Sequence, residues 1–168
     1  MTTSRTFRAD VIADDKDGKP VLLVEVKSRP VDDPRPADLP GYFPWPGRDE
    51  VVGKLSEDLH ATPEGVKFAM LVDPKIIQVY QRGSGRSINP VLQLSAPEVL
   101  RPYDPEFTGK PIYHDYLETL AEGWLRDLAY HWKSNTPPAA DDLERIGLLG
   151  LLKDGSTRRE AEVAGAEA

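Results

Sequence analysis

The sequence predicts a single domain of the α/β class. Three observations predict this class: short apolar runs typical of buried strands, longer segments with apolar residues at helical spacing, and turn signals between them. The apolar runs lie in Val21–Ser28 and Val66–Val72, and the helical patterns span Arg48–His60 and Ile112–Lys133. A chain of 168 residues suits one domain with a full hydrophobic core rather than two.

The chain opens with two strands joined by a tight turn. Thr6–Asp14 and Val21–Ser28 are predicted strands, and the turn Asp15–Gly18 ends in an Asp-Gly pair, which favours a positive φ. The second strand is apolar on both faces until Glu25, which is typical of a central strand covered on both sides. Glu25 and Lys27 alternate with Val26, so their side chains point to the same face.

A proline-rich segment, 29–46, follows the second strand. Proline at this density excludes a helix or a central strand, so we expect a long, semi-rigid insertion. Its aromatic residues Tyr42, Phe43 and Trp45 either anchor the insertion on the core or form a lid, a base-stacking platform or a partner surface.

The middle of the chain continues the α/β pattern. Arg48–His60 predicts a helix, and Val66–Val72 and Ile76–Gln81 predict strands on either side of a turn at Asp73-Pro74. Asn89–Pro111 is rich in proline, and we expect it to be irregular.

The last third predicts helices and then a tail. Ile112–Lys133 has the longest helical pattern, and Asp141–Leu152 predicts a short amphipathic helix. Residues 153–168 are rich in alanine and charge, so we expect a disordered tail after a domain that spans 1–152.

Composition restricts the function classes. The absence of cysteine excludes disulfides, thiolate metal sites and a cysteine nucleophile. No apolar run has the length of a membrane span and no signal peptide is visible, so we expect a cytoplasmic protein without membrane contact. The net charge of −7 does not favour tight, non-specific DNA binding by the chain alone.

Asp10, Glu25 and Lys27 form a candidate metal site. If the first two strands pair, Asp10 lies beside Glu25 and Lys27 at one sheet edge. Mg²⁺ or Mn²⁺ prefers oxygen ligands, which the two carboxylates and the Val26 carbonyl would supply. Such an ion polarises a phosphodiester and activates water, while Lys27 would stabilise the transition-state charge. The alternative is that these are surface charges of an ordinary hairpin.

This arrangement resembles the PD-(D/E)XK nuclease superfamily, which has the restriction-endonuclease-like fold. The resemblance rests on Asp10, followed across a turn by Glu25-Val26-Lys27 at the end of an apolar strand. Ala9 stands where the family often has proline. A helix and a further strand follow, as in a group of bacterial nucleases of this superfamily, and the resemblance covers about half of the chain, from Arg5 to Arg82.

The resemblance implies a mixed sheet of four or five strands flanked by helices, and a metal-dependent endonuclease that uses Mg²⁺ or Mn²⁺. It also implies Lys54 as an auxiliary residue, because some members use a helix lysine in place of the strand lysine. Many members carry another acidic residue on a helix before the first strand, and too few residues precede Asp10 here for that helix. Glu118 and Glu122 could replace it, but their place beside the apolar stripe favours exposure to solvent.

Two function classes remain open. The first is a nuclease acting on nucleic acid, DNA foremost, as a subunit of a bacterial defence or DNA-processing system. The second is a non-catalytic interaction module that retains the scaffold. In either case we expect a second copy or another protein as partner. The histidines His60, His114 and His131 show no metal-ligand spacing, and each is more typical of a surface or helix-face residue.

Overall fold

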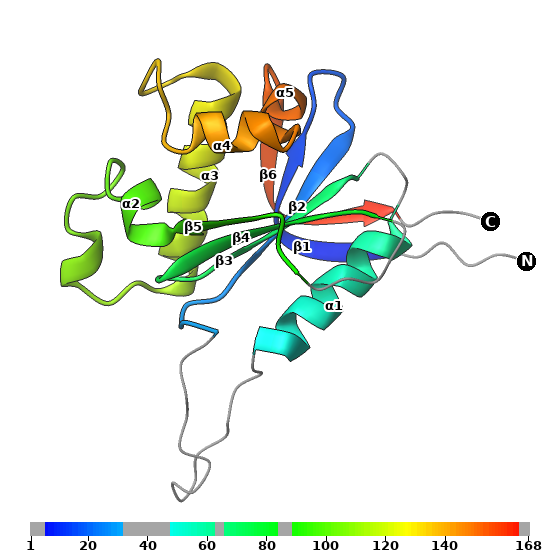
Figure 1. The fold of residues 1–168 in the computed structure, drawn as a ribbon, viewed down its shortest axis with the longest axis horizontal. Helices are drawn as coiled ribbons and strands as arrows, with labels where there is room; N and C mark the ends of the chain where they lie inside the picture. The colour runs from blue at the N-terminus through cyan, green and yellow to red at the C-terminus, as the bar shows by residue number, and fades with distance from the viewer. Residues whose placement is uncertain (1–5, 32–47, 63–65, 84–88, 165–168) are drawn as a thin grey trace, which may run out of the picture.

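The computed structural model describes residues 6–31, 48–62, 66–83 and 89–164 and is of the α/β class (Figure 1). The described strands form one mixed sheet of six strands in the order β5-β4-β3-β2-β1-β6, instead of the four or five expected. The strands are β1 (Thr6–Asp14), β2 (Pro20–Val26), β3 (Phe68–Val72), β4 (Ile76–Gln81), β5 (Leu92–Ser95) and β6 (Ser156–Ala164).

The opening hairpin is confirmed. β1 pairs antiparallel with β2, with Val11 opposite Val24 and Ala13 opposite Leu22. Gly18 closes the turn with a φ of 81°, a conformation that glycine adopts without steric cost. β3 runs parallel to β2, and helix α1 (Arg48–Ala61) lies on the connection between these two strands, as parallel pairing requires.

The helices cover both faces of the sheet (Figure 1). One core lies under α1, where Val52, Leu55 and Leu59 pack with Ile12 and Leu23. The other core lies under helix α3 (His114–Tyr130), and its largest fully buried side chain is Trp124. This second core also contains residues of three short helices, α2 (Ala96–Leu100), α4 (Ala140–Arg145) and α5 (Leu148–Leu152). The 3₁₀ turn η1 (Phe107–Gly109) lies between α2 and α3 in the sequence.

Three expectations about local structure were wrong. The segment Asn89–Pro111 holds β5 and α2, and two short helices replace the single one expected over Asp141–Leu152. The expected disordered tail, 153–168, instead contributes the strand β6, which pairs antiparallel with β1 along its whole length. A charged sequence forms a strand here because its partner supplies a long, regular edge.

Most of the proline-rich insertion 29–46, with its three aromatic residues, lies outside the described residues. Within the described ranges, no helix has both the length and the apolar character needed to cross a membrane.

Candidate metal centre

Asp10 lies where β1 and β2 separate. The pairing of the two strands, with a register shift between Ala13 and Asp14, extends from the turn as far as Val11 and Val24. Beyond that point, the backbone N–H of Val26 donates to Asp10 Oδ2 at 2.7 Å, so the carboxylate replaces a backbone partner. Burial raises the pKa of the Asp10 carboxyl above its usual value, although the Val26 N–H and the nearby His114 oppose this shift.

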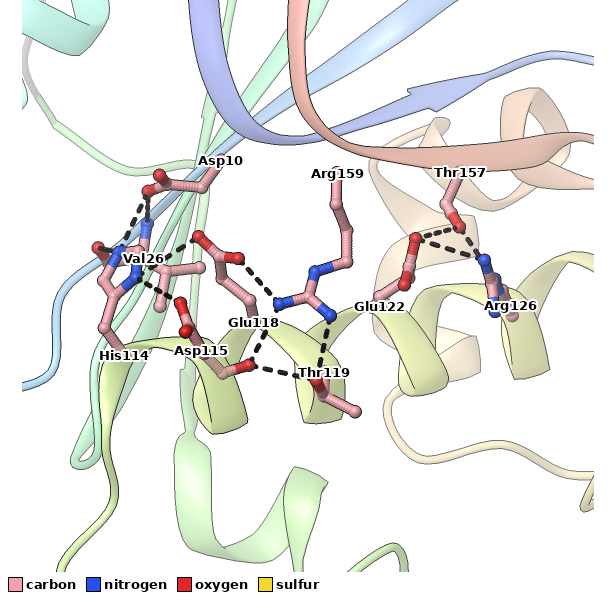
Figure 2. A network of polar contacts seen from close by, with 10 residues as sticks. All are labelled: Asp10, Val26, His114, Asp115, Glu118, Thr119, Glu122, Arg126, Thr157 and Arg159. Carbon is pink, nitrogen blue, oxygen red and sulfur yellow. Dashed lines mark hydrogen bonds and ion pairs between the residues drawn. The ribbon is translucent and has the colours of Figure 1, made fainter.

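Two side chains from the first turns of α3 meet this carboxylate (Figure 2). His114 Nε2 lies 3.1 Å from the Val26 carbonyl oxygen and 3.6 Å from Asp10 Oδ2. His114 Nδ1 lies 3.3 Å from Glu118 Oε1. One ligand atom from each of Asp10, His114 and Glu118 lies within 4.8 Å of the other two, which is a spacing that could hold a metal ion.

Glu118 has no exposed surface, and its two carboxylate oxygens have different surroundings. Oε2 accepts a hydrogen bond from Arg159 Nη2 at 3.0 Å, whereas the buried Oε1 accepts no hydrogen bond from the described residues. A buried carboxylate oxygen without a donor is costly. A cation between Glu118 Oε1, His114 and Asp10 would remove that cost, so these residues fit a divalent ion.

Arg159 fixes the position of Glu118 from the neighbouring strand β6. The guanidinium also donates to Thr119 Oγ1 at 3.1 Å and to the Asp115 carbonyl oxygen at 3.2 Å. These bonds connect β6 to two turns of α3 (Figure 2).

One helical turn beyond Glu118, the buried Glu122 accepts from Thr157 Oγ1 at 2.8 Å and pairs with Arg126 at 3.2 Å. The expectation that Glu118 and Glu122 are exposed to solvent was therefore wrong. Both carboxylates are buried because residues of β6 and α3 neutralise them.

Glu25 and Lys27 lie on the other side of β2. Their side chains pair at 3.1 Å and line an open cavity of about 220 Å³ with Lys54 of α1. The structure thus brings Glu25, Lys27 and Lys54 together, while Asp10 is grouped with His114 and Glu118. Lys27 is close enough to Asp10 for its positive charge to oppose the rise in the pKa of the Asp10 carboxyl.

His114 was missed by the sequence analysis. The usable signal was its spacing from Glu118, one helical turn along a helix whose buried face points at the sheet.

Comparison of the chain with family models, with curated proteins and with solved structures finds no match.

Proposed function

We propose that this protein is a metal-dependent nuclease that hydrolyses phosphodiester bonds, with DNA as the first substrate to test. The observation that carries the proposal is the convergence of Asp10, Glu118 and His114 at the open end of the β1–β2 hairpin, beside Lys27. A bound cation would account for the buried Glu118 Oε1, which accepts no hydrogen bond from the described residues.

Each residue has a defined role in this proposal. Asp10 and Glu118 hold Mg²⁺ or Mn²⁺ on the α3 side of the sheet. Glu25, on the α1 side, keeps Lys27 in place, and the Val26 carbonyl holds the ring of His114. The bound ion polarises the phosphate and lowers the pKa of water. Lys27, held by Glu25 at 3.1 Å, donates to the phosphate oxygen that gains charge in the transition state. Lys54 lines the same cavity and contributes positive charge toward the substrate backbone.

A cleavage assay tests the proposal. The wild type, Lys27→Ala and Asp10→Asn are incubated with single- and double-stranded DNA and RNA, with Mn²⁺, with Mg²⁺ or with chelator. Lys16→Ala, at an exposed position in the hairpin turn, is the matched control. Metal-dependent cleavage that both site variants lose and the control keeps supports the proposal. Cleavage equal in all four proteins indicates a contaminant, and no cleavage refutes nuclease activity of the chain by itself.

The alternative, a non-catalytic interaction module, is favoured by a different observation. Trp132 and Tyr130 are 52% and 49% exposed and line an open cavity of about 470 Å³ with Tyr103 and Tyr116. Exposed aromatic side chains around a hollow are typical of protein-binding surfaces. Absence of both cleavage and metal binding would favour this function.

A further inference from the structure

The ring of His114 is surrounded by hydrogen-bond acceptors. Its Nε2 faces the Val26 carbonyl at 3.1 Å and Asp10 Oδ2 at 3.6 Å. Its Nδ1 faces Glu118 Oε1 at 3.3 Å and Asp115 Oδ1 at 3.7 Å. A neutral imidazole has one N–H donor and one lone pair, so it satisfies the acceptors on one side only. On the Nδ1 side, either a second proton on the ring or a metal ion would join the nitrogen to the carboxylates of Glu118 and Asp115.

The contacts indicate which nitrogen is the ligand. The Val26 carbonyl accepts at Nε2, which is the usual way in which a metal-binding histidine is held by its second nitrogen. Nδ1 then carries the lone pair and points to the buried Glu118 Oε1, which lacks a donor among the described residues. Because Arg159 already holds the other oxygen of Glu118 at 3.0 Å, Oε1 is the atom left for a cation.

We propose that His114 is a nitrogen ligand of this centre, and that the centre therefore selects a transition-metal ion of the Mn²⁺ or Zn²⁺ type over Mg²⁺. The inference rests on the metal binding in the proposed function and deepens it. Mg²⁺ takes hard oxygen ligands and keeps most of its waters, whereas imidazole suits transition-metal ions. A site of two carboxylates and one imidazole is thus of mixed oxygen and nitrogen character.

The affinity of the site for each ion tests the proposal directly. Titration calorimetry is carried out with Mn²⁺ and with Mg²⁺ on the wild type, on His114→Ala and on the control His60→Ala, whose histidine is exposed on α1. We expect the wild type and the control to bind Mn²⁺ at least about tenfold more tightly than Mg²⁺. His114→Ala should lose about tenfold or more of its Mn²⁺ affinity and keep its Mg²⁺ affinity within about threefold.

A spectroscopic measurement makes the test independent of affinity. Pulsed electron paramagnetic resonance of bound Mn²⁺ should show coupling to one imidazole nitrogen in the wild type and none in His114→Ala. Thermal unfolding checks that this variant is folded, which we expect because the His114 side chain is 42% exposed. Equal affinities for the two ions, a preference that survives in His114→Ala, absence of nitrogen coupling, or no metal binding would each overturn the inference.

The outcomes separate this inference from the proposed function. Nitrogen coupling and Mn²⁺ preference without any cleavage would support the ligand assignment and refute the nuclease. Metal-dependent cleavage with equal binding of both ions would support the nuclease and overturn the role of His114.

Discussion

Gly155 lies at the junction of α5 and β6, and we expect Gly155→Ala to destabilise the protein by about 3 kcal/mol. A Cβ atom at this position would lie 2.0 Å from the carbonyl oxygen of Asp14 and 3.1 Å from that of Leu152. Real Cβ atoms essentially never approach other heavy atoms closer than 3.0 Å, so β6 and β1 must move apart by about 1 Å. Because the obstacle is backbone, no side-chain rotation can relieve it, and the cost falls at the upper end for overpacking.

Urea unfolding and thermal unfolding measure this change. In a domain of this size about 3 kcal/mol corresponds to a lower Tm by about 6–12 °C. Gly53→Ala is the matched control, because Gly53 lies in α1 with nothing within 4 Å of the added Cβ. Alanine there should stabilise the helix by about 0.5–1 kcal/mol. A Gly155→Ala protein as stable as the wild type would refute the close packing of β6 on β1.

Three further predictions concern carboxylates that are buried or partly buried. Arg159→Met should lower the free energy of unfolding in urea by about 3 kcal/mol, because it leaves the charge of Glu118 buried without its partner. The double variant Arg159→Met, Glu118→Gln should recover most of that loss. Asp10→Asn should raise the Tm in chelator, because burial raises the pKa of the Asp10 carboxyl and so disfavours its charge. The same variant should lose the stabilisation that Mn²⁺ gives to the wild type. Burial alone would raise the pKa of Asp127, but hydrogen bonds from the Tyr103 hydroxyl and two backbone N–H groups hold it below its usual 3.8. The stability that these bonds give is present above pH 3.8 and is lost below it. Asp127→Asn should therefore flatten the fall in Tm between about pH 5 and pH 3.

Each of these has an outcome that contradicts it. Additive losses in the Arg159 and Glu118 double-mutant cycle would show that the two side chains do not interact. A lower Tm for Asp10→Asn would mean that the carboxylate charge is favourable without metal. An unchanged acid transition in Asp127→Asn would exclude Asp127 as a source of acid sensitivity.

Local sequence signals predicted the elements that local chemistry specifies. The Asp-Gly turn and the apolar second strand were sufficient for the hairpin from Thr6 to Val26, and the bounds of β1 and β4 agree with the structure. Asp10, Glu25 and Lys27 were singled out from residue type and spacing. Spacing alone could not show that Asp10 turns toward α3 while Glu25 and Lys27 face α1, because that depends on where β1 leaves β2.

The wrong expectations share a non-local cause. Glu118 looked like a solvent-facing helix residue, and the residue that neutralises it, Arg159, lies in a segment that composition assigned to a disordered tail. Neither position could be interpreted correctly without the other. The charged strand β6 is stable because β1 offers it a full-length edge and because Arg158 pairs with the buried Asp14 at 2.8 Å.

The position of β6 beside β1 has a consequence for synthesis of the chain. Arg158 and Asp14 are 144 positions apart, so the outer edge of β1 has no β6 to pair with until residues 156–164 have left the ribosome. Contacts at such separation form late in folding, and an unpaired strand edge is a template for aggregation. Because Arg159 reaches Glu118 from β6, the candidate site of Asp10, His114 and Glu118 is completed only after β6 has been synthesised.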